Sequence, residues 1–290
     1  MRGFSAVFKM QARRMLTRKR FGLLFLAMSL LVTTSYLETC VAASDGDVRC
    51  IYSAATGWIG RINAFGGFNI GKWTPSIMKM FFNFFLILFG ALAFSDFYDT
   101  DQRAGIYPAL ITRCSSNAYH VSGAILCFLG AFAVIAAPLL ISQGLMFFLF
   151  PAQTVVNERL ATINPLWKQM WGEGVLFPSL FFNHPYLTNL LYIFYDGLMA
   201  GTWALVSYVL SLFVRKARFL FLILPVVLLA AVSYTAGCFG LFFLIYDHYL
   251  YPGSGFVKYP AVFAAYVLVP LAACILILFR RLRKKGADEL

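Results

Sequence analysis

The chain has 290 residues, of which 61% are hydrophobic and only 12% are charged, and its formal net charge is +12. About a quarter of the residues of a soluble domain are charged, so this composition excludes a soluble globular protein and indicates an integral membrane protein. Several runs of about 20 residues hold almost no charge, which is enough to cross about 30 Å of hydrocarbon as a helix. Because the alternating segments of a membrane β-barrel are missing from the sequence, we expect an all-α integral membrane protein with six transmembrane helices.

The first 20 residues have the pattern of an amphipathic helix. Neutral and mostly apolar side chains fall on one face and basic ones elsewhere: Phe4, Val7, Phe8, Gln11, Met15 and Leu16 against Lys9, Arg13 and Arg14. We therefore predict an amphipathic interfacial helix over residues 1–20. A cleaved signal peptide is the alternative, because a basic region precedes an apolar one, but the apolar segment is long for that role.

Six long apolar runs are the predicted spans. They cover Phe21–Tyr36, Ile77–Phe94, Val121–Phe150, Leu190–Phe213, Phe219–Ile245 and Ala261–Phe279. Together they form a six-span transmembrane domain over residues 21–279, with a loop over residues 95–120 inside it and a basic tail over residues 280–290.

The distribution of Lys and Arg predicts the orientation. Most of the 24 basic residues precede the first span, follow the sixth, or lie in the second-to-third and fourth-to-fifth connections. The positive-inside rule then places both termini in the cytoplasm, and we expect a multi-pass protein of the cell membrane, most simply the bacterial cytoplasmic membrane. Since these basic clusters adjoin spans, they predict attraction to anionic lipid and no nucleic-acid partner.

The first outer connection carries two features. Cys40 and Cys50 form a disulfide if that compartment is oxidising, and free thiols are the equal alternative. "GGFNIGKW" gives Gly66, Gly71 and Lys72 the spacing of a phosphate loop, but a Trp stands where that loop needs Ser or Thr, and no strand precedes it. We therefore expect no ATP site in this chain.

Other chemistry-bearing residues are scattered. The three histidines, His120, His184 and His248, lie in separate parts of the sequence, and neither H-E-x-x-H nor paired C-x-x-C motifs occur. We predict no catalytic, cofactor-binding or metal-binding residues and no enzymatic activity. Asp196 lies about two turns into the fourth span; because intramembrane charge is costly, it is a candidate polar site, with satisfaction by nearby Tyr or Thr hydroxyls as the alternative.

The connection between the second and third spans, residues 95–120, is the main inner loop. Its three carboxylates, Asp96, Asp99 and Asp101, oppose the positive-inside bias. Gly105 permits a sharp turn, and "GIYPALITR" predicts a short helix that starts near Pro108 and docks one face. The combination predicts a docking surface for a soluble partner.

This loop resembles the cytoplasmic loop of ABC-2-type transporter permeases. The resemblance rests on Asp101-x-x-x-Gly105, an apolar stretch, Thr112-Arg113, and Tyr119 just before the next span. The overall plan of a basic N-terminal helix and six spans is also similar. Three positions depart from the family pattern: Cys114 replaces a Gly, Asn117 an Arg and Gly123 a Lys.

The resemblance implies the permease subunit of an ATP-binding cassette exporter. Such a subunit pairs with a separate ATP-binding subunit, which holds ATP and Mg²⁺, and works as a homodimer or heterodimer of permeases. The implied partner-coupling residues are Asp96, Asp99, Asp101, Gly105, Thr112 and Arg113, with the acids meeting basic residues of the partner. Family relatives export peptides, antibiotics or lipids, but the sequence does not predict the substrate here.

Two other classes fit the same composition. One is a self-sufficient secondary transporter or channel that works through Asp196. The other is a membrane immunity or scaffold protein that transports nothing.

Overall fold

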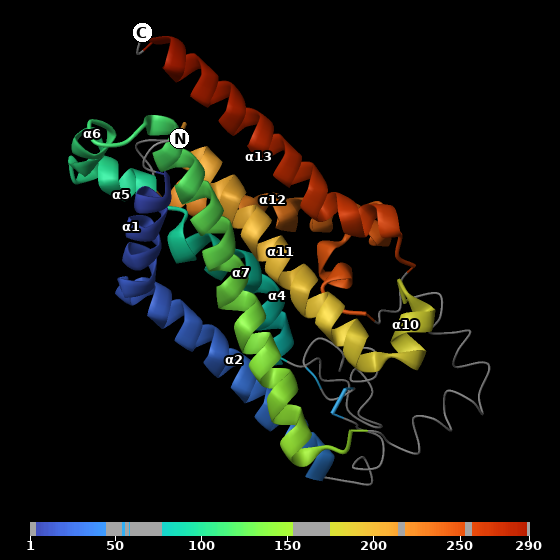
Figure 1. Ribbon diagram of the computed structural model, residues 1–290. Coiled ribbons are helices and arrows are strands. Elements are labelled where there is room, and N and C mark those ends of the chain that lie inside the picture. The colour runs from blue at the N-terminus through green and yellow to red at the C-terminus, as the bar shows by residue number, and fades with distance from the viewer. Residues whose placement is uncertain are drawn as a thin grey trace.

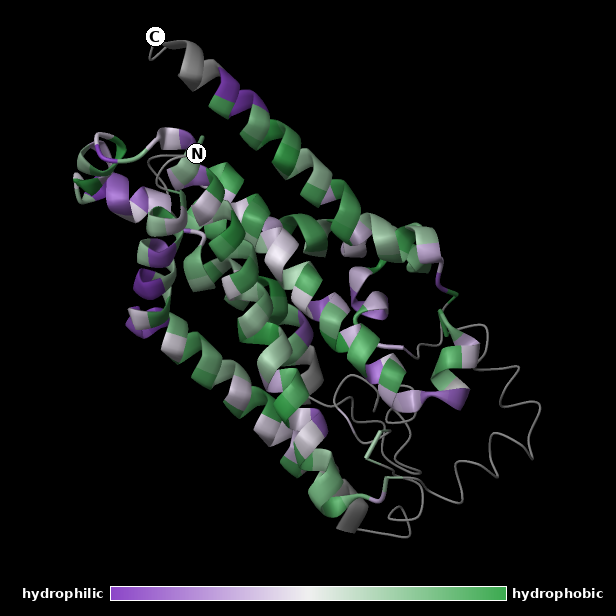
Figure 2. Ribbon diagram, in the orientation of Figure 1, coloured by the Kyte–Doolittle hydropathy of each residue, from purple (hydrophilic) through white to green (hydrophobic). Residues whose placement is uncertain are grey.

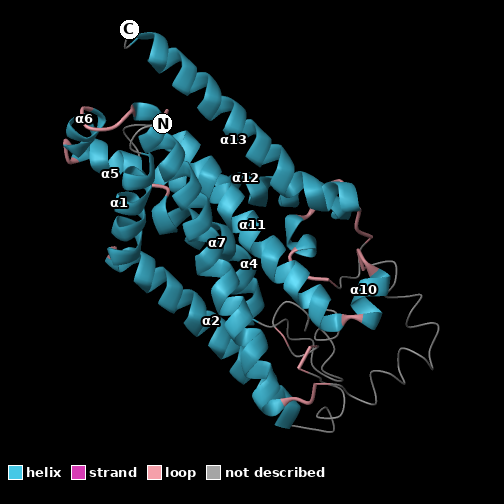
Figure 3. Cartoon of the chain, in the orientation of Figure 1, coloured by secondary structure: helices cyan, strands magenta, loops and turns pink. Residues whose placement is uncertain are grey.

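The computed structural model describes residues 4–44, 54–55, 58, 77–152, 175–213, 218–252 and 257–288. Throughout these segments the regular structure is helical and no strand occurs (Figure 3). The α-helices are α1 (Phe4–Thr17), α2 (Lys19–Ser44), α4 (Ile77–Phe94), α5 (Phe97–Arg103), α6 (Ile106–Ile111), α7 (Ser116–Leu149), α10 (Pro178–Asn183), α11 (Pro185–Ser211), α12 (Arg218–Cys238) and α13 (Pro260–Asp288). Two 3-10 turns, η2 (Phe242–Leu244) and η3 (Tyr246–Tyr249), separate α12 from α13.

Six of these helices are long and apolar enough to cross a membrane. They are α2, α4 continued by α5 as far as Arg103, α7, α11, α12 and α13, in the order that the sequence predicts. The all-α, six-span prediction is confirmed to this extent, and the chain is a multi-pass membrane protein. Which face of the membrane the termini occupy stays a prediction.

The fifth predicted span is too long. It was expected to continue to Ile245, whereas α12 ends at Cys238. Gly240 follows with a φ of 71°, a left-handed conformation that favours glycine and turns the chain away from the helix axis. The chain then returns to the bundle through η2 and η3, where the Tyr246 hydroxyl donates to the carbonyl of Asn83 in α4 over 3.3 Å.

The centre of the bundle is the pair α7 and α11, which pack along one another and against α4. Small residues make this approach possible. A Cβ added to Gly201 of α11 would lie 2.9 Å from the carbonyl oxygen of Phe128 in α7, and one on Gly90 of α4 would lie 3.0 Å from that of Ala200. Close backbone contact through small residues is the usual way in which membrane helices associate, because lipid offers no hydrophobic drive for it.

Helix α1 packs against α7 through the predicted apolar face. Val7, Gln11 and Met15 are buried, and the Gln11 amide donates to the carbonyl of Tyr119 over 3.3 Å. Leu16 was assigned to the same face, but it is 64% exposed, so that assignment is wrong. Whether α1 also lies in a membrane interface stays a prediction.

One end of the bundle gathers the polar residues. The start of α1 lies near α5 and α6 at this end, and α13 also ends on this side of the bundle (Figure 1). Hydrophilic residues concentrate in α1, α5 and the C-terminal part of α13, while the long helices are mostly hydrophobic (Figure 2). This polar end positions the site described next.

Candidate functional site

The site is built on the connection between α4 and α7, and we call residues 96–113 the loop hairpin. Its two short helices, α5 and α6, meet at Gly105, which has a φ of 67°. An L-residue rarely adopts this conformation, so the turn requires glycine, as the sequence predicts. The Ser115 hydroxyl then accepts from the backbone amide of Ala118 and caps the start of α7.

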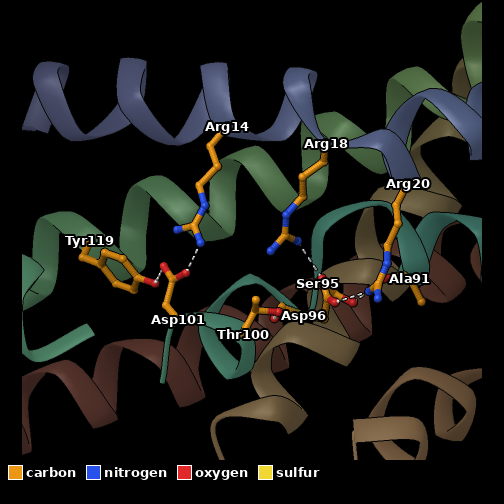
Figure 4. Close-up of polar contacts among 9 residues, drawn as sticks. All are labelled: Arg14, Arg18, Arg20, Ala91, Ser95, Asp96, Thr100, Asp101 and Tyr119. Atoms are coloured by element: carbon orange, nitrogen blue, oxygen red, sulfur yellow. Dashed lines mark hydrogen bonds and ion pairs between the residues drawn. The ribbon is translucent and has the colours of Figure 1, made fainter. Parts of the chain in front are cut away.

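Asp101 is the most buried carboxylate of the loop hairpin, with 1% of its surface exposed. One of its oxygens lies 2.5 Å from a guanidinium nitrogen of Arg14 in α1. The other accepts a 2.6 Å hydrogen bond from the hydroxyl of Tyr119 in α7 (Figure 4). Asp101 therefore joins α5 to two other helices at once.

Asp96, at the start of α5, lies between two arginines. Arg18 contacts one carboxylate oxygen at 2.9 Å, and Arg20 contacts the other at 3.0 Å (Figure 4). Burial, then repulsion from Arg14, lowers the pKa of Arg18, and attraction to Asp101 opposes this effect. A partly buried guanidinium among like charges needs carboxylates close by, and Asp96 and Asp101 supply them.

Asp99 pairs within its own helix. Its carboxylate lies 3.0 Å from the Nε of Arg103, one turn further along α5. Half of the Arg103 side chain is exposed, so this pair contributes about 0.3–0.5 kcal/mol, the size usual for helical neighbours.

The three acids thus face the chain's own arginines. The sequence predicted that they would meet basic residues of a partner, and their burial against intrachain cations does not fit that contact. Their geometry fits a different task, which is to fasten the loop hairpin to the N-terminal helices. The arginines that complete the site were missed, although the four-residue spacing of Arg14 and Arg18 places both on one helical face.

The loop hairpin also has exposed residues, which together we call its outer face. Gly105, Thr112 and Arg113, the other three predicted coupling residues, are exposed there. Ile106 is 41% exposed beside them, whereas Tyr107 on the inner face of α6 is buried. The predicted coupling set is therefore divided between an inner, fastened face and an outer, accessible one.

A buried polar chain continues from the inner face into the bundle. The Tyr107 hydroxyl lies 3.1 Å from Nε2 of His120 in α7, and Nδ1 of His120 lies 2.8 Å from the hydroxyl of Tyr208 in α11. Both imidazole nitrogens are thus engaged, one on each side of the ring. Through them, α6 is linked to α7 and α11.

Gly123, which departs from the family pattern, has a structural reason. The ring of Phe97 in α5 occupies the space beside it, and a Cβ on Gly123 would overlap that ring. Phe97 also stacks on Tyr208 at 4.9 Å between ring centroids. The glycine therefore lets α5 lie directly against the start of α7.

Asp196 lies elsewhere, in the middle of α11. It is fully buried and interacts electrostatically with the hydroxyls of Tyr192 and Tyr195. The Tyr195 ring stacks on Phe263 of α13 at 3.8 Å. This core contains polar groups, but its role as a site stays a prediction.

The remaining candidates lie partly outside the described residues. Cys40 carries a free thiol, and its predicted partner Cys50 lies outside the described residues, as do Gly66, Gly71 and Lys72. In the parts of the chain that the structure describes, no group of three or more His, Cys, Asp or Glu side chains is placed to hold a metal ion.

Comparisons with protein-family models, with curated proteins and with solved structures found no match to this chain. The chain is a multi-pass α-helical membrane protein in which ion pairs fasten a helical hairpin to one end of the bundle.

Proposed function

We propose that this chain is the permease subunit of an ATP-driven exporter and that the loop hairpin receives force from a separate ATP-binding subunit. That partner binds ATP and Mg²⁺. Two copies of the permease form the substrate pathway at the interface between them. The proposal keeps both termini and the loop hairpin in the cytoplasm, as the charge distribution predicts.

The observation that supports it is the two-sided construction of the loop hairpin. Its inner face is bound to the bundle through Asp96 and Asp101, and its outer face exposes Ile106, Thr112 and Arg113. A loop with only a connecting role needs no buried carboxylates, because burial of charge is costly unless it is paired. A segment that transmits force needs both a rigid attachment and an accessible surface.

The attachment suggests how motion is transmitted. Closure of the ATP-binding partner presses on the outer face, and the Asp101–Arg14 and Asp96–Arg18 pairs carry this displacement to the α1–α2 junction. Tyr107, through His120, carries it to α11. Since α2 and α11 lie on different sides of α7 (Figure 1), a tilt of the loop hairpin reorients spans on both sides of the bundle core.

A purification experiment with matched variants tests the proposal. The chain is isolated from native membranes, and ATP hydrolysis and associated proteins are measured. We expect Arg113→Glu to lower the retained ATPase activity at least tenfold, since it reverses a charge on the exposed face. Arg280→Glu, the same change at an exposed position of α13, is the control and retains the activity. The proposal fails if both variants keep the activity, or if no ATPase accompanies the unaltered chain.

A second candidate function follows from Asp196. A fully buried carboxylate in a span-length helix is a recurrent feature of self-sufficient secondary transporters. In that case the purified chain alone moves solute across liposome membranes, and Asp196→Asn abolishes the movement. The permease proposal predicts that the purified chain alone moves no solute.

A further inference from the structure

An open hollow lies along the exposed side of α1. Its lining residues are Lys9, Met10, Arg13, Arg14 and Thr17. Lys9, Arg13 and Thr17 follow one another at intervals of four residues, so they share one face of the helix. We call this hollow the α1 groove.

The α1 groove is strongly cationic. Three of its five lining residues are basic and none is acidic. Arg14 pairs with Asp101 at the back, whereas Lys9 and Arg13 are exposed and form no ion pair with any residue that the structure describes. The Thr17 hydroxyl already donates to the carbonyl of Arg13. Binding of a ligand in the groove therefore depends mainly on the two cations without an ion pair, Lys9 and Arg13. Guanidinium and ammonium groups at one spot favour an oxygen-rich anion such as a phosphate.

The surroundings of the α1 groove are apolar and accessible. Met10, which lines the groove, is 41% exposed, and Leu16 follows Arg13 by three residues on the same side of α1. In α2, the next helix along the chain, Leu23 is 63% exposed. Because α2 is a span-length helix, we expect its exposed apolar side chains to face acyl chains, and the cations of α1 come just before it in the chain.

We propose that the α1 groove binds the phosphate of an anionic lipid headgroup. Lys9, Arg13 and Arg14 contact the phosphate, while Met10 and Leu16 lie against the upper part of an acyl chain. A free phosphate would contact the three cations but would leave the apolar side chains beside them without a partner. An acidic protein would have to compete with lipid for those apolar side chains.

The position of Arg14 links this lipid to the candidate site. Its guanidinium lines the α1 groove and also holds Asp101 of the loop hairpin. A bound headgroup therefore adds negative charge beside the ion pair that fastens α5, so lipid composition changes the strength of that attachment. The lipid site itself does not rest on the proposed function, because every contacting residue belongs to this chain.

Native mass spectrometry of the purified full-length chain tests the inference. The chain is mixed with phosphatidylglycerol, with phosphatidylcholine, or with inorganic phosphate as a competitor. The test variant is Lys9→Gln/Arg13→Gln, which spares Arg14 and its pair. The control is Lys19→Gln/Arg280→Gln, which removes the same charge at two exposed positions outside the groove. Helical content by circular dichroism shows that both variants fold.

We expect selective retention of phosphatidylglycerol, about thirtyfold weaker in the test variant and unchanged in the control, as the loss of two membrane-facing cations predicts. Equal losses in the two variants would overturn the inference, because diffuse charge would then explain binding. Equal retention of phosphatidylcholine would overturn it, as would displacement by inorganic phosphate at the lipid's own concentration. Unchanged lipid binding together with loss of a co-purifying protein would assign the groove to that protein instead.

Discussion

Replacement of Asp101 by alanine is the most informative single perturbation of the site. Asp101 is buried, and it accepts from the Tyr119 hydroxyl and pairs with Arg14. Tyr119 is fully buried, so the loss of its acceptor costs about 1–3 kcal/mol. The ion pair adds about 1 kcal/mol, a discounted value because a third of the Arg14 side chain is exposed. The expected loss of unfolding free energy is therefore about 2–4 kcal/mol.

Denaturant unfolding in detergent micelles measures this loss, and hydrogen exchange of α5 shows where it arises. A double-mutant cycle with Arg14→Gln isolates the ion pair, and we expect a coupling energy of about 1 kcal/mol. Asn117→Ala, an exposed change near the same loop, is the control and stays within about 0.5 kcal/mol of the unaltered chain. An Asp101→Ala variant as stable as this control would refute the attachment, and zero coupling with Arg14 would refute the ion pair.

Three further predictions concern the surroundings of the site and the opposite end of the bundle. Gly123→Ala forces the Phe97 ring aside and costs about 1–3 kcal/mol in the same unfolding assay, with faster hydrogen exchange of α5 as the local sign. His120→Phe removes the partner of the Tyr208 hydroxyl and lowers the unfolding free energy by a similar amount; no change would show that the polar chain is unimportant for stability. Burial lowers the pKa of Lys258 to about 7, so between that pH and its ordinary pKa of 10.5 the unfolded chain binds more protons than the folded one. Stability then rises with pH across this window, and Lys258→Met, followed by denaturant unfolding over the same window, flattens the rise.

The spans were predictable because their signal is local. Continuous apolar runs of the right length located all six, and the second matched α4 at both ends, Ile77 and Phe94. The fifth was wrong at its C-terminal end, because the sequence stays apolar past Cys238 although the helix ends there. The turn at Gly240 depends on conformation, and no change of hydropathy marks it.

The loop hairpin was predictable in part for the same reason. Gly105 and the short helix after it are local features, and both are present. The ion-pair partners of the carboxylates were not predictable. Asp101 and Arg14 are distant in sequence and meet only because α1 packs against α7. The excess of acids against the topology bias singled out carboxylates that form ion pairs in the structure, but it gave no information on whether their partners lay inside or outside the chain.

The contact between the outer face of the loop hairpin and a separate ATPase is the central claim, and site-specific cross-linking tests it most directly. A photoreactive amino acid at the exposed position Thr112 is activated in native membranes, and the adducts are identified by mass spectrometry. The same probe at exposed Phe242, in η2, is the control. We predict that Thr112 captures a soluble protein that carries a phosphate loop and that Phe242 does not. Adducts of Thr112 with lipid or with other copies of this chain alone would contradict the account.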